Sequence, residues 1–211
     1  MPPNADYLFR EQNVIAELKT MTGIFAGPEA PKQLVNAYID AGGTGSELMG
    51  LLLRGEAIPE PVKMLIGKRI RRSLEQRIRR ARKQLRQSKT FFGNDRTKTL
   101  IIFAMDQPPL FGHSSMLTHI AKVMSDNYSD AETDGVIYLN PNMPTQMSDD
   151  GMELSGWYPI YRDDDANKEL SQFVNILGNR WLTFYGQKIG ETNPILELKS
   201  PEDMMALLRR R

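Results

Sequence analysis

The sequence predicts an α/β fold in which a mixed central sheet is flanked by helices. Short apolar segments of strand length alternate with amphipathic segments of helical length along the 211 residues. Two of the short segments, LIIFAM (100–105) and GVIYL (135–139), are continuously apolar, as in strands buried on both faces. A chain of this length is expected to form one domain, so we expect a single domain over residues 1–211.

The first sixty residues predict a strand hairpin followed by two short helices. Residues 6–10 and 14–19 have the composition of short strands, and the polar EQN between them is a plausible turn. Residues 22–31 contain two glycines and two prolines, which indicates a loop. Residues 32–54 look helical with a break at Gly42–Gly45, after which Ser46 is the expected N-cap.

A long amphipathic helix is expected from about residue 62 to residue 89. Its apolar stripe recurs every three or four residues, which is helical spacing, and consists of Ile66, Ile70, Leu74, Ile78, Ala81, Leu85 and Ser88. Arginines occupy the other faces. Such a helix would be roughly 40 Å long.

The second half of the chain continues the alternation. We expect a helix over 114–127, a polar loop over 140–153 and an edge strand over 157–162, because Pro159 cannot donate to a neighbouring strand. The acidic run Asp163–Asp165 is expected to be a loop or an N-cap before a helix over 167–185. The tail, 191–211, has a short strand-like segment and a short helix-like segment.

Composition excludes several classes of protein. The chain has no cysteine, so disulfides, thiolate zinc sites and a cysteine nucleophile are excluded, and a cytoplasmic protein is expected. Only two histidines are present, which excludes a three-histidine metal site. A membrane span needs an apolar run of about 18 residues, and the sequence has none.

The formal charge of +1 conceals a strong asymmetry. Residues 68–89 contain eleven of the basic residues and one acid, a net charge of +10, whereas the rest of the chain has 16 basic and 25 acidic residues, a net of −9. This asymmetry is typical of a polyanion partner or a partner surface. The residues expected to bind nucleic acid, DNA first, are Arg71, Arg72, Arg79, Arg80, Arg82, Lys83 and Arg86.

Three residues of the N-terminal hairpin form a candidate catalytic set. Glu17 and Lys19 alternate with apolar residues, so they share one face of a strand. If the paired residue numbers of the hairpin sum to an odd value, Asp6 lies on that same face; a shift of one residue puts it on the other. Two carboxylates on paired strands provide oxygen ligands for Mg²⁺ or Mn²⁺.

Asp6 followed by Glu17-x-Lys19 on the next strand resembles the PD-(D/E)XK, or restriction-endonuclease-like, nuclease superfamily. Pro3 would be the proline of that signature, displaced by two residues, and Glu197-Leu198-Lys199 is a second E-x-K that lacks a preceding aspartate strand. Members usually have a helix and a strand before the aspartate strand, whereas here five residues precede Asp6.

The resemblance implies a restriction-endonuclease-like core in which residues 20–60 are a helical insertion and 140–211 a C-terminal extension. It implies that Asp6, Glu17 and the Leu18 carbonyl bind Mg²⁺ or Mn²⁺, that Lys19 acts on the water or the phosphate, and that Gln84 is an accessory residue. The expected function is metal-dependent hydrolysis of DNA, or secondarily of RNA.

The residues alone are compatible with three further hypotheses. The Asp6, Glu17 and Lys19 set also fits a solvated hairpin face that forms a cross-strand salt bridge. The basic helix also fits a non-catalytic nucleic-acid-binding or assembly subunit, within a homo-oligomer or a larger complex. A lipid-surface helix is the third, although such helices favour bulky aromatic anchors and this stripe is aliphatic.

Overall fold

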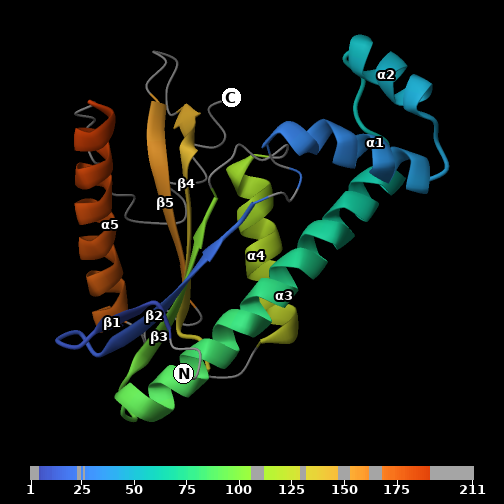
Figure 1. The fold of residues 1–211 in the computed structure, drawn as a ribbon. Helices are drawn as coiled ribbons and strands as arrows, with labels where there is room; N and C mark the ends of the chain where they lie inside the picture. Colours follow the sequence, from blue (N-terminus) through green and yellow to red (C-terminus); the bar gives the residue numbers. More distant parts are fainter. Residues whose placement is uncertain are drawn as a thin grey trace.

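A five-stranded mixed sheet forms the centre of the molecule (Figure 1). The computed structural model describes residues 5–22, 25, 27–105, 112–128, 132–146, 153–161 and 168–190. The strands lie side by side in chain order: β1 (Tyr7–Phe9), β2 (Val14–Thr20), β3 (Lys98–Ala104), β4 (Gly135–Gln146) and β5 (Glu153–Tyr161). The predicted α/β class, with a mixed sheet and flanking helices, is confirmed.

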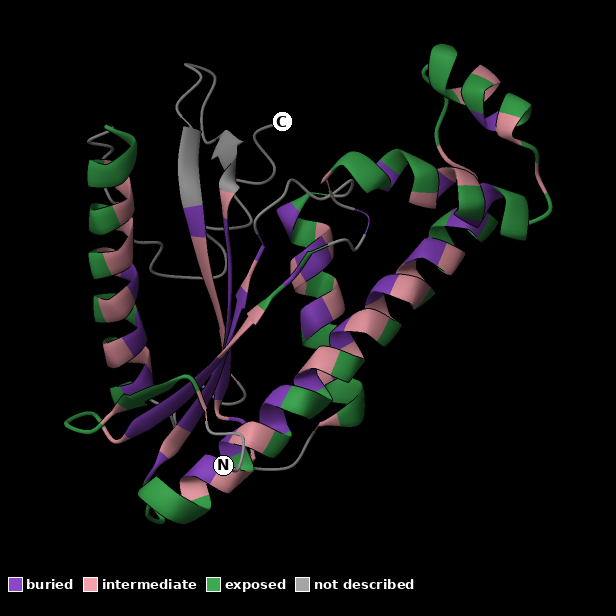
Figure 2. Ribbon diagram, in the orientation of Figure 1, coloured by how far each residue is buried: buried purple, intermediate pink, exposed green. Residues whose placement is uncertain are grey.

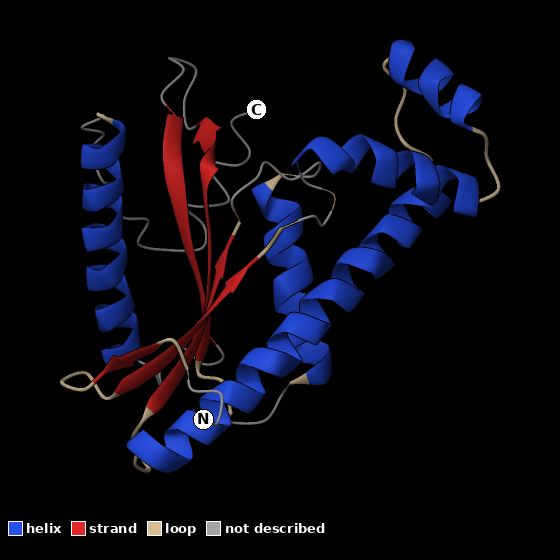
Figure 3. Ribbon diagram, in the orientation of Figure 1, coloured by secondary structure: helices blue, strands red, loops and turns tan. Residues whose placement is uncertain are grey.

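The three central strands are parallel and the two edge strands are antiparallel to their neighbours. α3 (Glu60–Phe92) connects β2 to β3, and α4 (His113–Asn127) connects β3 to β4. Both helices cover one face of the sheet, and α5 (Lys168–Ile189) covers the other (Figures 1 and 3). β5, which contains Pro159, is an edge strand, as the sequence predicted.

Alternate side chains of the central strands supply two separate apolar layers. Ile15, Ile101 and Phe103 pack toward α3 and α4. Val14 and Ala16 belong to the layer beneath α5. The buried residues therefore run along both sides of the sheet, with exposed residues on the outer faces of the helices (Figure 2).

α3 is 33 residues long, so it spans about 50 Å. Every member of the predicted stripe, from Ile66 to Ser88, is buried. The period-3.6 pattern therefore identified the inner face of this helix correctly. Beyond the predicted range, the helix continues for a few residues at each end, from Glu60 to Phe92.

The segment between β2 and α3 contains a short 3-10 turn, η1 (Gly27–Glu29), and two helices, α1 (Ala30–Asp40) and α2 (Gly45–Leu53). The break between these helices was predicted, but the expected N-cap Ser46 is wrong. Thr44 is the cap, because its side chain accepts from the Glu47 N–H while the Glu47 carboxylate accepts from the Thr44 N–H. This reciprocal capping box places Ser46 inside the first helical turn.

The predicted loop over 140–153 is wrong at both ends. β4 continues to Gln146 and β5 begins at Glu153, with a register shift between Asn140 and Thr145. Backbone pairing of Asn140, Thr145 and Gln146 with β5 extends the strands into this polar segment, which its side-chain pattern does not indicate. Pro3, Asp163–Asp165 and the tail with Glu197–Lys199 lie outside the described residues.

Within the described part of the chain, no helix combines the length and apolar character that a membrane span requires.

Candidate active site

β2 places Glu17 and Lys19 on the sheet face that α3 covers. Side chains alternate along a strand, and Ile15 of β2 lies in the apolar layer under α3. β1 pairs Tyr7 with Ala16 and Phe9 with Val14, so the paired numbers sum to an odd value. Extrapolated by one residue, this register puts Asp6 opposite Glu17 and on its face.

The β1–β2 ladder ends at Asp6 in an unusual way. In a continued ladder Ala5 and Leu18 would exchange backbone hydrogen bonds. Instead, the Leu18 N–H donates to Asp6 Oδ2 at 2.8 Å, and the Ala5 N–H donates to Ser88 Oγ of α3 at 2.6 Å. The Leu18 carbonyl, on the same side of β2 as its N–H, thus loses the Ala5 donor that a continued ladder would supply.

Lys19 is held between the sheet and α3. Its Nζ forms an ion pair with Glu17 Oε1 and donates to Gln84 Oε1 at 2.8 Å. An ammonium group has three N–H donors, so these two contacts leave one for a ligand. The structure therefore brings together Glu17, Lys19 and Gln84, the predicted accessory residue, although Gln84 lies 65 positions from Lys19 in the sequence.

Glu17 is the most buried charged residue of this set, with 1% of its surface exposed. Its Oε2 is buried and has no hydrogen-bond partner among the described residues. Burial raises the pKa of the Glu17 carboxyl above its ordinary value of 4.5; the hydrogen bond and charge of Lys19 oppose this rise, and the charge of Asp6 adds to it. Most buried carboxylate oxygens have a partner, so an orphaned one marks a position where a ligand would be stabilising.

The oxygen atoms that Glu17, Asp6 and Leu18 offer are of the chemical type that a hard divalent cation prefers. Glu17 Oε2, the exposed Asp6 carboxylate and the Leu18 carbonyl are all oxygen donors, and the described residues contribute no thiolate or imidazole to them. Within the described ranges no three acidic, histidine or cysteine side chains cluster as a complete protein cage. Mg²⁺ commonly uses one or two carboxylates and completes its shell with water and substrate phosphate, so this donor set suits it.

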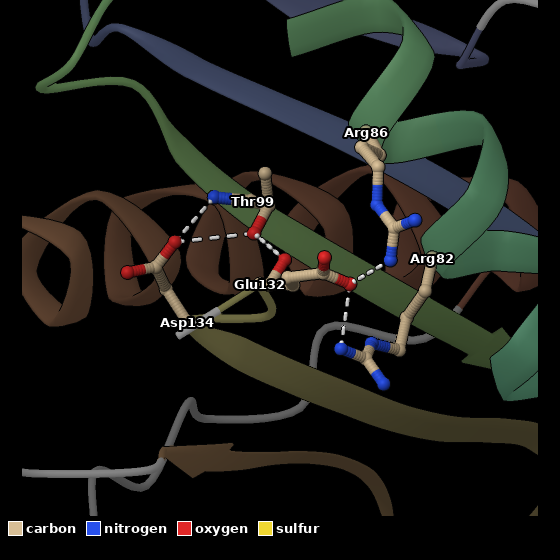
Figure 4. Close-up of polar contacts among 5 residues, drawn as sticks. All are labelled: Arg82, Arg86, Thr99, Glu132 and Asp134. Atoms are coloured by element: carbon tan, nitrogen blue, oxygen red, sulfur yellow. Dashed lines mark hydrogen bonds and ion pairs between the residues drawn. The ribbon is translucent and has the colours of Figure 1, made fainter. Parts of the chain in front are cut away.

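Three of the seven predicted nucleic-acid-binding residues are engaged by acids of the chain itself. Arg71 pairs with Asp126 at 2.8 Å. Arg82 is buried, pairs with Glu132 at 2.7 Å and lies 4.4 Å from the Tyr128 ring centroid. Arg86 pairs with the same Glu132 oxygen at 2.5 Å (Figure 4).

The acids beside these arginines also anchor the start of β3. Asp134 Oδ2 accepts from the Thr99 N–H at 2.8 Å, and Thr99 Oγ1 donates to the Glu132 carbonyl at 2.9 Å (Figure 4). Glu132 thus connects α3 to the beginning of the central strands. The contacts of Arg82 and Arg86 support the fold at this place.

The other four predicted binding residues, Arg72, Arg79, Arg80 and Lys83, are exposed, and no ion pair joins them to another described residue. They point in two directions. Arg72, Arg79 and Lys83 are spaced by seven and four residues, so they share the outward face of α3. Arg80 precedes Gln84 by four residues and therefore lies on the side of the candidate active site.

Sequence reasoning missed two residues at this site. Ser88 was placed in the apolar stripe without a function. A serine at a buried position was the available signal, because a buried hydroxyl needs a hydrogen-bond partner. Arg77 was counted in the basic segment but not as a binding residue. Its contact with the Thr22 carbonyl joins residues 55 positions apart, which no local pattern indicates.

Comparison of this chain with models of protein families, with curated proteins and with solved structures found no match.

Proposed function

We propose that this protein is a metal-dependent nuclease that hydrolyses phosphodiester bonds, with DNA as the expected substrate and RNA the secondary one. The observation that carries the proposal is the buried Glu17 carboxylate, whose Oε2 has no described partner while Oε1 holds Lys19. A bound Mg²⁺ or Mn²⁺ would stabilise the charge that grows on a phosphate and would lower the pKa of a bound water.

The chain's own residues have distinct tasks in this proposal. Glu17, Asp6 and the Leu18 carbonyl would hold the cation. Gln84 and Glu17 orient the Lys19 ammonium group through two acceptor contacts. The third N–H of Lys19 would then hold the attacking water or a non-bridging phosphate oxygen, and its positive charge would stabilise the transition state.

A simple cross-strand salt bridge explains these contacts less well. An exposed ion pair contributes about 0–1 kcal/mol and does not require burial of one partner. Burying a carboxylate costs several kcal/mol unless its oxygens are compensated, and one Glu17 oxygen is not. Retaining such a group has a physical reason if a cation and a substrate complete the site.

The test is cleavage of DNA and RNA with Mg²⁺ or Mn²⁺ by the wild type, Glu17→Gln, Lys19→Gln and Asp6→Asn. Glu11→Gln is the matched control, since Glu11 is an exposed carboxylate in the same hairpin. We expect cleavage by the wild type and the control, and a loss of at least about a hundredfold in Glu17→Gln and Lys19→Gln. Equal rates in all variants would contradict the assignment.

Absence of cleavage by the wild type, with salt-sensitive binding retained, would favour a non-catalytic nucleic-acid-binding or assembly subunit. The exposed basic side chains Arg72, Arg79 and Lys83 are compatible with that alternative.

A further inference from the structure

Two arginines of α3 lie beside the candidate active site. Arg80 and Arg77 precede Gln84 by four and seven residues, so all three share one side of the helix. Gln84 contacts Lys19, and Arg77 Nη2 contacts the Thr22 carbonyl, just after β2, at 3.5 Å. Gln84, Arg80 and Arg77 therefore form a row along α3 that begins beside Lys19 and is about 10 Å long.

Neither arginine has an acidic partner among the described residues. Arg77 donates to Ser73 Oγ and, at 3.3 Å, to the Ser73 carbonyl, and both acceptors are neutral. Arg80 is exposed, and no hydrogen bond or ion pair joins it to the side chain of another described residue. Burial, and secondly the charge of Arg80, lower the pKa of the Arg77 guanidinium.

Four other arginines of α3 pair with acids of the chain. Arg69 pairs with Asp40, and Arg71 pairs with Asp126. Arg82 and Arg86 both pair with Glu132. Two like charges close together are unfavourable, and partial burial increases the effect because it reduces solvent screening. Arg72 and Arg79 also have no described acidic partner, but they lie on the outward face of α3. Arg77 and Arg80 are therefore the arginines on the side of Gln84 and Lys19 for which an external anion would relieve the repulsion between like charges.

We propose that Arg77 and Arg80 form a phosphate subsite that holds a phosphate next to the one at Lys19 on the same nucleic-acid strand. This inference rests on the proposed function and extends it by defining the path of the strand over the protein, from Lys19 along the Thr22 side of α3. Arg77 is positioned by Ser73 and Thr22, whereas the exposed Arg80 side chain can turn toward the ligand. The outward residues Arg72, Arg79 and Lys83 would contact phosphates farther from the scissile bond.

The experiment measures DNA affinity against salt concentration in a cleavage-silent Glu17→Gln background, with a fluorescein-labelled DNA oligonucleotide as the probe. Arg77→Gln/Arg80→Gln is compared with Lys63→Gln/Lys68→Gln, which makes the same charge change at exposed positions near the start of α3. Arg80→Gln alone is included because Arg80 is exposed and its replacement disturbs no packing.

We expect the Arg77/Arg80 variant to lose about tenfold in affinity and to reduce the slope of log K against log salt by about 1.4–1.8, which corresponds to two phosphate contacts. Arg80→Gln alone should lose about half of that slope, and the lysine control less than Arg80→Gln. Equal slope losses in the two double variants, or no DNA binding by the parent, would overturn the subsite.

The experiments can reject the phosphate subsite and the nuclease function independently of each other. A wild type that does not cleave, together with the expected slope losses, rejects the nuclease function and retains the subsite. A wild type that cleaves in a Glu17-dependent way, together with equal slope losses, rejects the subsite and retains the nuclease function.

Discussion

Glu17 is the residue at which stability and proposed function conflict most clearly. Its carboxylate is buried, one oxygen has no described partner, and burial raises its pKa. The folded protein therefore favours the protonated form more than the unfolded chain does. Glu17 supports stability below its ordinary pKa of 4.5, and this support is lost as the pH rises through the raised value. A cation bound at neutral pH would reverse that loss.

We predict that Mg²⁺ raises the Tm of the wild type at neutral pH but not that of Glu17→Gln. At a Mg²⁺ concentration ten times Kd, the linkage is about 1.4 kcal/mol. For a domain of this size it corresponds to a Tm shift of about 3–6 °C. Without Mg²⁺, Glu17→Gln should be at least as stable as the wild type, because it removes a buried charge that the Lys19 ion pair compensates only in part. Thermal unfolding with and without Mg²⁺ measures both effects.

The Glu11→Gln protein is the control for that experiment, and it should respond to Mg²⁺ as the wild type does. An equal Mg²⁺ shift in Glu17→Gln would place the bound cation somewhere other than at Glu17.

His119 gives a second prediction at the scale of one residue, concerning pH. Its ring lies against Gly67 of α3, where an added Cβ would come within 3.3 Å of Cε1. Burial, followed by the charges of Arg71 and Lys122, lowers the pKa of His119 below its ordinary value of 6.5. Its contribution to stability is thus present above 6.5 and lost as the pH falls through the lowered pKa.

We expect the Tm of the wild type to fall relative to that of His119→Gln between about pH 7.5 and about pH 5, since glutamine does not titrate. A pH series of thermal unfolding curves measures the difference. Parallel curves for the two proteins would show that His119 does not contribute to the pH dependence.

At the scale of elements, α3 organises the candidate active site from one side. Its buried stripe anchors it on the sheet, and its polar positions Gln84 and Ser88 hold Lys19 and the Ala5 N–H. The position of Asp6 therefore depends on a hydrogen bond between the start of the chain and the end of this helix. One element sets the geometry of residues from two strands.

Ser88→Ala should loosen Asp6 without unfolding the protein. The substitution removes the acceptor for the Ala5 N–H, and a lost buried hydrogen bond costs about 1–3 kcal/mol. We expect the Mg²⁺ concentration that half-saturates cleavage to rise several-fold, while cleavage at saturating Mg²⁺ changes less. Thr90→Ala, an exposed position on the same helix, is the control. A change in maximal rate with no change in Mg²⁺ dependence would contradict a role in placing Asp6.

The elements were largely predictable because their patterns are local. The spacing from Ile66 to Ser88 defined the inner face of α3, and the apolar runs defined β3 and the first half of β4. Local patterns could not predict which side chains contact each other between distant parts of the sequence. Glu132 meets Arg82 across 50 residues, and Thr22 meets Arg77 across 55, so a count of basic residues cannot separate engaged arginines from available ones.

The same limit applied to the candidate site. Alternation along β2 put Glu17 and Lys19 on one face, but the side of Asp6 depended on the hairpin register, which the turn sequence left open. The extension of β4 and β5 into the polar segment was missed because pairing there depends on backbone hydrogen bonds rather than on apolar alternation.

At the scale of the whole molecule, the charge of α3 is divided between internal and external uses. On the side facing α4 and Glu132, three arginines pair with two acids of the same chain, Asp126 and Glu132. Arg72, Arg77, Arg79, Arg80 and Lys83 have no acidic partner among the described residues and remain available to a polyanion. The near-zero net charge of +1 is therefore compatible with a strongly one-sided surface.

This division predicts the salt dependence of nucleic-acid binding. If those five side chains each neutralise one phosphate, log K should fall against log salt with a slope of about −3.5 on single strands and about −4.5 on duplexes. If Arg71, Arg82 and Arg86 also leave their acids for phosphates, eight contacts would give about −5.6 to −7.2 instead. Binding isotherms of Glu17→Gln protein at several salt concentrations distinguish the two cases.

Glu132→Gln tests the division directly, because it removes the acid that holds two of these arginines. Arg86, which is exposed, would lose its ion pair with Glu132, so it should contact phosphate more readily and the slope should steepen by at most about one contact. Arg82 would stay buried and lose its ion pair with Glu132, and the protein should lose about 1–3 kcal/mol of stability. Glu11→Gln makes the same change in net charge elsewhere, and it should alter neither quantity beyond a small general effect. A wild-type slope already in the eight-contact range, unchanged by Glu132→Gln, would mean that the internal pairs give way to nucleic acid and that α3 binds as one undivided basic surface.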